Sequence, residues 1–436
     1  MAVSRLLRAG LVVVSLAIPA GVHGESAGLR RVVAAGQPAP GGGTFEHFTI
    51  ESQPVVAPVN AKGEVAFFAT LLRGPATEGL FLASGPRVDK VALEGDRAPG
   101  GGTLSGFGRH PIPAINRAGS VAFAAAVSGG KTVEGIFVAS RGRLRPVARA
   151  GEPAPGLPSG TLANLDYPAL NDRGDVAFLA TVRRGRETVE VIYLLTGGRL
   201  KKVVAQEDPA PAGGAFAGFG APALNNSGAV AFGAVIEGRA VPGGVFVADG
   251  DRVRMLVGAG EETPLGGIFA KFSERLALND AGTVVFTGRL KDAPVEAAIF
   301  VVDQGRFRKI VALGETAPGG GTFANFGFWP ALSATGSVAF IGAVDQGPAS
   351  LAVFVAGPTG ARKLAGIGEP LPRGGTLASF GLHPSAAMSP TGHLTFATAP
   401  TATGEGSRRS SWRAGAPASR SRTGTRSWAC AVSRTA

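Results

Sequence analysis

One short phrase recurs seven times along this chain of 436 residues. It reads Gly-x-[Val/Leu]-x-Phe, and successive copies are 56, 55, 54, 54, 54 and 56 residues apart. The seven glycines are Gly63, Gly119, Gly174, Gly228, Gly282, Gly336 and Gly392. Such regular spacing indicates a tandem array of one supersecondary unit, in which each unit buries its apolar surface against its neighbours.

The phrase belongs to a predicted β-hairpin. In the third copy an apolar run ends at Leu170, a turn of Asn, Asp, Arg and Gly follows, and a β-rich run continues to Val182. Gly174 can adopt the positive φ that such a turn needs, and Asn171 can bond its own backbone. The same place is held by Asn60, Asn116, Asn171, Asn225 and Asn279, and by Ser333 and Ser389 in the last two copies.

A second hairpin follows in each copy. Its first strand has the pattern Gly-[Leu/Ile/Val]-Phe-[Leu/Val]-Ala, as in residues 135–139, and its second is basic and then apolar, as in residues 143–148. A segment rich in Gly and Pro links one copy to the next, as in residues 95–104, and excludes a regular element there. Each copy therefore predicts four short strands.

We predict an all-β fold of tandem four-stranded repeats, a seven-bladed β-propeller with an incomplete last blade. The alternative is an open stack of β-sheets or two β-sandwich domains. Aromatic side chains near each linking segment are expected to pack between neighbouring sheets rather than to contact a cofactor: Phe48, Phe107, Phe219, Phe326 and Phe380.

The phase of the repeats predicts how the ring closes. Residues 30–35 correspond to the fourth strand of the unit, whereas the last complete hairpin ends near Thr398, so the two ends of the chain should share a blade. The third strand of that blade is expected at residues 405–412, whose Gly, Ser and Arg residues suit a strand poorly. We therefore predict that Val32 and Val33 lack a partner strand and that closure is weakened.

The two ends of the chain differ from the repeats. Residues 1–24 carry Arg5 and Arg8, then an apolar run and small residues, the pattern of a secretory signal peptide that is removed on export. The seven repeats then form one β domain of residues 25–406. Residues 407–436 form a tail with seven Arg and no acidic residue. This tail is either a basic disordered segment or an out-of-frame translation of a GC-rich gene.

Charge and cysteine content limit the classes of partner. The tail carries seven positive charges and residues 1–24 two, which leaves +3 of the formal +12 for residues 25–406. A nearly neutral domain of this length argues against nucleic-acid binding. The single cysteine, Cys430, allows no intramolecular disulfide, and no second long apolar run suggests a transmembrane segment. We expect a secreted or periplasmic monomer.

The repeats resemble a known family. Residues Asn116 to Phe123, Asn171 to Phe178 and Asn225 to Phe232 fit the pattern N-x-x-G-x-x-A-F, which is similar to tandem-repeat proteins of exported bacterial origin. The resemblance covers about residues 30–400 and implies an exported surface or periplasmic repeat protein without an established activity. It brings no catalytic residue. Val285 replaces the Ala in the fifth copy, and no anchor follows the array.

One recurring set of polar residues is a candidate site. An acidic residue follows the linking glycine or its equivalent in six copies, with Gln37 in the first: Asp96, Glu152, Asp208, Glu261, Glu315 and Glu369. Six carboxylates on one rim could bind calcium or a cationic ligand. Alternatively, each carboxylate accepts backbone N–H groups and holds its own turn, which we favour because it recurs with the fold.

No chemical motif assigns a reaction. The five histidines, including His110, show no metal-ligand spacing, and neither a Gly-x-Ser-x-Gly nor a His-Glu-x-x-His motif occurs. We expect a non-catalytic surface or binding scaffold that recognises an extracellular ligand or a cell-surface component. The alternative is a secreted hydrolase or lyase acting on glycans or phosphoesters at the central channel.

Overall fold

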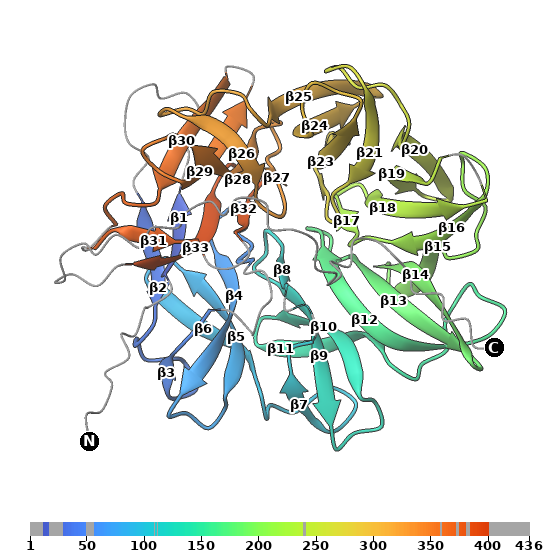
Figure 1. Cartoon of the computed structure of the whole chain (residues 1–436). Coiled ribbons are helices and arrows are strands. Elements are labelled where there is room, and N and C mark those ends of the chain that lie inside the picture. The colour runs from blue at the N-terminus through green and yellow to red at the C-terminus, as the bar shows by residue number, and fades with distance from the viewer. Residues whose placement is uncertain are drawn as a thin grey trace, which may run out of the picture.

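The computed structural model of the chain describes residues 12–16, 29–48, 56–108, 110, 112–238, 241–357, 360–371, 375–380 and 384–400. Every regular element in these ranges is a β-strand, and the small sheets stand around a common centre (Figure 1). The predicted all-β propeller is thereby confirmed, and the open stack and the two sandwich domains are excluded. No helix that could cross a membrane occurs in the described ranges.

Six sheets consist of strands that follow one another along the chain, each in the order inner strand to outer strand. The first contains β3 (Thr44–Phe45), β4 (Val65–Leu72), β5 (Glu78–Ser84) and β6 (Arg87–Leu93). The second contains β7 (Thr103–Gly106), β8 (Ala114–Ile115), β9 (Val121–Ser128), β10 (Glu134–Ser140) and β11 (Arg143–Arg149). The third contains β12 (Thr161–Leu170), β13 (Val176–Arg184), β14 (Glu187–Thr196) and β15 (Arg199–Ala205).

The next three sheets repeat this plan. The fourth contains β16 (Ala215–Phe219), β17 (Ala223–Leu224), β18 (Val230–Glu237), β19 (Gly243–Asp249) and β20 (Arg252–Gly258). The fifth contains β21 (Ile268–Phe272), β22 (Ala277–Leu278), β23 (Val284–Lys291), β24 (Ala297–Asp303) and β25 (Arg306–Ala312). The sixth contains β26 (Thr322–Phe326), β27 (Ala331–Leu332), β28 (Val338–Asp345), β29 (Leu351–Gly357) and β30 (Gly360–Gly366).

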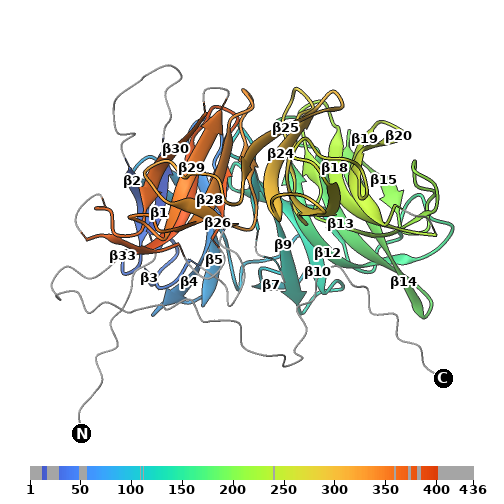
Figure 2. The same ribbon diagram turned by 45° about the horizontal axis from the view of Figure 1, so that its top comes forward.

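The remaining strands form a sheet that is not built from one repeat, so six blades of consecutive strands stand where seven blades with an incomplete last one were predicted. This composite sheet joins β31 (Leu377–Ser379), β32 (Ala386–Met388) and β33 (Leu394–Pro400) to β1 (Val12–Leu16) and β2 (Arg30–Ala34). In Figures 1 and 2 the blue N-terminal strands lie beside the red C-terminal ones. The chain thus has six blades of consecutive strands, and both of its ends close the ring.

The place beside Val33, which was predicted to lack a strand, is filled by residues of the predicted signal peptide. β1 lies between β2 and β33 and is antiparallel to both, with Val13 opposite Val33 on one side and Ala397 on the other. Its β-branched run has the high strand propensity that residues 405–412 lack. Residues 405–412 and the predicted tail lie outside the described residues.

The core lies between the sheets. Each hydrophobic cluster combines the facing sides of two neighbouring sheets, as where Ile136 and Val138 of the second meet Phe178 and Tyr193 of the third. Phe48, Phe107, Phe219 and Phe380 are buried as predicted, whereas Phe326 is only partly buried. Because a fully buried large apolar side chain contributes about 1.5–3 kcal/mol, these inter-sheet layers stabilise the contacts between neighbouring sheets.

Candidate binding site in the central channel

The inner strands line a central channel. Its middle is a cavity of about 270 Å³ lined by residues of all seven sheets. One ring of aliphatic side chains comes directly before the hairpin turns: Val59, Ile115, Leu170, Leu224, Leu278, Leu332 and Met388. A proline ring lies two residues further back in four copies: Pro113, Pro168, Pro222 and Pro330. Because the aliphatic position recurs in every copy, this part of the channel is lined by equivalent residues of the blades.

The hairpin turns form a hydrogen-bonded ring at one end of the channel. Oδ1 of Asn171 accepts the N–H groups of Arg173 at 3.1 Å and Asp175 at 2.9 Å, which is the predicted bond to its own turn. Gly174 has a φ of +84°, as the turn requires. Nδ2 of Asn171 also donates to the carbonyl of Asn225 in the next blade at 3.1 Å.

We call this set the asparagine ring: Asn60, Asn116, Asn171, Asn225 and Asn279. Each member donates Nδ2 to the backbone carbonyl of the equivalent residue in the next blade, at 3.0–3.2 Å. Sequence reasoning missed these inter-blade bonds. Ser333 keeps only the bond within its turn, where its Oγ accepts the N–H of Ser337 at 3.0 Å.

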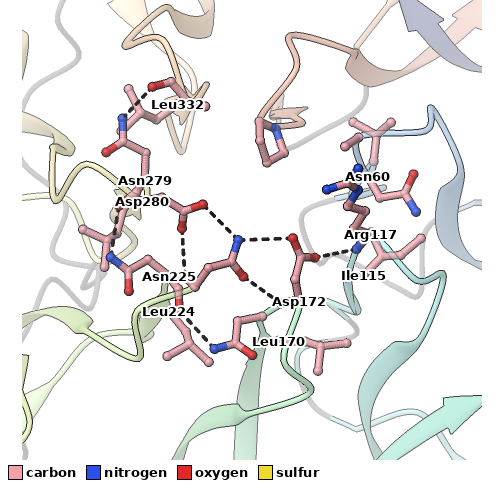
Figure 3. A pocket seen from close by; sticks show the side chains of 17 residues that line it. Asn60, Ile115, Arg117, Leu170, Asp172, Leu224, Asn225, Asn279, Asp280 and Leu332 are labelled. Atoms are coloured by element: carbon pink, nitrogen blue, oxygen red, sulfur yellow. Dashed lines mark hydrogen bonds between the residues drawn. The ribbon is translucent and has the colours of Figure 1, made fainter.

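The residues that follow the asparagine ring link neighbouring blades through charge (Figure 3). Nδ2 of Asn226 donates to carboxylate oxygens of Asp172 at 3.1 Å and Asp280 at 2.9 Å. The N–H of Arg117 donates to Asp172 at 2.7 Å, and that of Asn226 to Asp280 at 2.8 Å. Both carboxylates therefore accept hydrogen bonds from neighbouring blades. We call these four residues the interlock: Arg117, Asp172, Asn226 and Asp280.

The predicted acidic set lies elsewhere. Asp96, Asp208, Glu315 and their equivalents each accept the backbone N–H three residues earlier, at 2.8–3.1 Å. Oε1 of Gln37 does the same for Ala34. Five of the six carboxylates also pair with a Lys or Arg of their own fourth strand. These bonds are those of the turn-holding interpretation, and none of the six lines the channel cavities.

At the opposite end of the channel the repeat is broken. Four residues before the turn Asn or Ser, most copies carry a small or aliphatic residue, such as Ile112 or Ala221, but three carry Tyr167, Arg275 and Trp329. A cavity of about 170 Å³ lies among these three side chains, and we call it the aromatic site. Its remaining lining residues are Phe219, Gly220, Ala221 and Glu274. With a strand rise of 3.3 Å per residue, it lies roughly 13 Å from the asparagine ring.

Arg275 is the strongest electrostatic feature of the aromatic site. Its guanidinium carbon lies 5.3 Å from the centre of the Trp329 ring, a cation–π contact. Nη1 is buried and has no hydrogen-bond partner among the described residues, and no carboxylate in those ranges forms an ion pair with Arg275. Burial lowers the pKa of Arg275 to about 10, and nearby Tyr167 opposes this shift. The group remains a cation at neutral pH, with donor capacity to spare.

Tyr167 joins this cation to a histidine and a carboxylate. The His110 ring stacks on Tyr167 with centroids 4.5 Å apart, and Nδ1 of His110 contacts the carboxylate of Asp166. Tyr167 has a φ of +51°, rare for a bulky residue, and its N–H donates to Asp166 at 2.9 Å. Burial and then the charges of Asp166 and Glu274 raise the pKa of Tyr167, so its hydroxyl stays protonated.

Sequence reasoning found no metal-ligand spacing around His110 and did not single out Tyr167, Arg275 or Trp329. The signal for the last three was present in the sequence as three departures, at a place where the other copies are small or aliphatic. Within the described ranges, no three His, Cys, Asp or Glu side chains form a group that could hold a metal ion. The arrangement suits recognition of an anionic group beside aromatic faces.

These features define a β-propeller with a polar interlock at one end of its channel and an aromatic, cationic site at the other. The chain belongs to the Family of unknown function (DUF7453), which it matches over residues 19–299 and 278–420. No curated protein matches the chain significantly.

Several solved structures are similar to this chain at low identity. A puromycin-hydrolyzing peptidase of Mycobacterium tuberculosis is 14% identical with a TM-score of 0.45, over 81% of this chain and 52% of that protein. An oligogalacturonate lyase in complex with manganese is 11% identical with a TM-score of 0.46, over 84% and 96%. A calcium-binding protein, regucalcin, of Agrobacterium tumefaciens is 15% identical with a TM-score of 0.33, over 76% and 98%. The chain spans about half the length of the peptidase, and similarities of this size carry no information on activity.

Proposed function

We propose that this chain is an exported, non-catalytic binding protein that holds a small anionic ligand at the aromatic site. One observation carries the proposal: Nη1 of Arg275 is buried without a hydrogen-bond partner beside a cavity among Tyr167, Phe219 and Trp329. A buried donor left unpaired costs about 1–3 kcal/mol, and a charged one more. A carboxylate or phosphate oxygen would supply the missing acceptor.

The same cavity favours a ligand with a flat or apolar face. The rings of Tyr167 and Trp329 offer large contact areas, and the protonated Tyr167 hydroxyl adds a neutral donor. Glu274 lines the cavity as well and would repel a ligand that carries several negative charges. The ligand class is therefore a monoanion with an aromatic ring or a sugar ring.

Pairs of small molecules that match in shape and differ in charge test this proposal. Thermal unfolding of the whole chain is measured with benzoate against benzamide, with glucuronate against glucose, and with inorganic phosphate. We expect the anion of at least one pair to raise the melting temperature while its neutral analogue does not. Equal shifts within both pairs, or no shift with any probe, would show that Arg275 does not select a monoanion.

A hydrolase or lyase is the second candidate, because His110 and Asp166 form a pair suited to proton transfer. Two features weigh against it. Burial and nearby carboxylates raise the pKa of Tyr167, which opposes its use as a base, and Asp172 and Asp280 are held by the interlock at the other end of the channel. Turnover of a uronate oligosaccharide or of a phosphate monoester, lost in His110→Ala, would establish the enzyme instead.

A further inference from the structure

The composite sheet contains a strand from a segment predicted to be removed. β1 belongs to residues 1–24, which have the pattern of a signal peptide, yet it is hydrogen-bonded between β33 and β2. Its removal would leave two strand edges facing each other across one strand's width. Unpaired edges of this kind are templates for an added strand.

β1 takes the register of the third strand of a blade. Val12 and Val14 lie opposite Thr398 and Phe396 of β33. In the second blade Gly135 and Phe137 of β10 lie opposite Ala125 and Phe123, which are the equivalent positions of β9. Residue for residue, Val12, Val13 and Val14 occupy the places of Gly135, Ile136 and Phe137.

The irregularity on the other side of the strand is reproduced too. Between β1 and β2 the register shifts at Val13/Val14, and between β10 and β11 it shifts at Ile136/Phe137. The third strands of the six repeat blades all shift at this place, and each has a fully buried aromatic residue there: Phe81, Phe137, Tyr193, Phe246, Phe300 and Phe354. By comparison with the six repeat blades, the strand expected between β33 and β2 has an aromatic residue at the place where β1 has Val14.

Both edges also contact elements other than β1. Leu394 and Phe396 of β33 belong to the cluster shared with the sixth blade, and β33 also pairs with β31 and β32. Val33 of β2 belongs to the cluster of the first blade, and the N–H of Gly36 donates to the carbonyl of Phe45 at 2.8 Å. These contacts do not involve β1.

We propose that the position between β33 and β2 is a strand-acceptor site for another protein. After residues 1–24 are removed, it takes an uncharged, extended segment of the Gly-Ile-Phe-Val-Ala type, antiparallel to both edges. The chain's own residues 405–412 suit the site poorly, because they include Arg408, Arg409 and three Ser. This interaction is separate from the ligand proposed for the aromatic site.

The test uses the full chain with a protease site introduced within residues 20–24, so that cleavage follows folding. The labelled probe is the peptide Gly-Ile-Phe-Val-Ala-Ser, the sequence of residues 135–140. We expect it to displace the cleaved N-terminal fragment, to bind at one copy per chain and to raise the melting temperature. The matched peptide with Phe137→Pro, which lacks the central N–H, should bind at least tenfold more weakly.

Each contrary outcome overturns the proposal. If the cleaved fragment stays bound and the probe cannot displace it, β1 is a permanent strand of the fold. If the fragment leaves without a change in melting temperature and the probe does not bind, the position accepts no strand. Equal binding of the probe and its proline variant would show that the contact is not strand addition.

Discussion

The guanidinium carbon of Arg275 lies 5.3 Å from the centre of the Trp329 ring, across the boundary between the fifth and sixth blades. Both residues stand at the same place of the repeat, four residues before the turn Asn or Ser. Propeller symmetry brings equivalent positions together around the axis, so two independent departures from the repeat become neighbours. The aromatic site arises from this convergence.

The second blade has Ile112 at the place of Arg275. The substitution Arg275→Ile should raise the stability of the chain and abolish anion binding. Arg275→Ile removes a cation whose Nη1 is buried without a partner, and it also loses a cation–π contact worth about 0.5–2 kcal/mol. We expect the free energy of unfolding to rise by about 1 kcal/mol, while the response to anions is lost. Urea unfolding measures the first effect, and Arg143→Ile, at the exposed start of β11, should change it by less than about 0.5 kcal/mol.

The asparagine ring predicts a graded loss of stability in the fourth blade. Asn225→Ala removes the acceptor for Ser227 and Ala229 and the donor to Asn279. Because Asn225 is buried, we expect a cost of about 2–4 kcal/mol. Asn225→Ser, which imitates Ser333, retains the acceptor and should cost about half as much. No cost for Asn225→Ser in chemical denaturation would mean that the inter-blade bond contributes nothing, and equal costs for both variants would mean that the bonds within the turn contribute nothing.

The interlock predicts a salt-dependent effect. Asn226→Asp replaces the amide that donates to both Asp172 and Asp280 by a third carboxylate. We expect the melting temperature to fall at low ionic strength and to recover partly in 0.5 M salt, because screening weakens repulsion between exposed like charges. Asn226→Ala loses the donor without adding charge, so its melting temperature should depend little on salt. A salt response of the same size in both variants would contradict the interlock.

The Asp175 carboxylate predicts a pH-dependent contribution. Burial tends to raise its pKa, but hydrogen bonds from Asn171, Thr196 and Arg173 outweigh burial, so the pKa is lowered in the folded state. A lowered pKa means that the stabilisation is present above the unfolded-state value of about 3.9 and is lost as the pH falls through the folded-state value.

Asp175→Asn should therefore be destabilising at pH 7 by about 1–2 kcal/mol. The difference from the original chain should shrink below pH 4 as the carboxylate is protonated. Urea unfolding at several pH values measures it, with Asp89→Asn on the exposed outer strand as the control. A difference that stays constant down to pH 2 would assign the loss to packing instead.

The strands were predictable because each is specified locally. The turn from Asn or Ser to Gly and the β-rich run that contains Phe178 recur in seven copies, so one assignment serves all of them. The asparagine ring was only half predictable: the bond within each turn is local, whereas the bond from Asn171 to Asn225 depends on how neighbouring blades are placed. The constant period carried that information, because equivalent residues of adjacent blades must face the same axis.

The aromatic site and the ring closure could not be predicted from local patterns. Tyr167, Arg275 and Trp329 come from three blades, and only the closed ring brings them to one cavity. The pairing of Val14 with Phe396 joins residues at opposite ends of the chain. The apolar run around Val14 fits export and strand formation equally well, because both depend on the same β-branched and aliphatic residues.

The most direct test of the central claim is a fluorescence titration of Trp329. In a chain with Trp412→Phe and Trp428→Phe, Trp329 is the single tryptophan and reports on the aromatic site. We predict saturable quenching by the anion that raises the melting temperature, at least tenfold weaker in Arg275→Gln and unchanged in Arg87→Gln on the exposed outer strand of the first blade. Equal affinity in Arg275→Gln, or no saturable change, would contradict an anion site at Arg275.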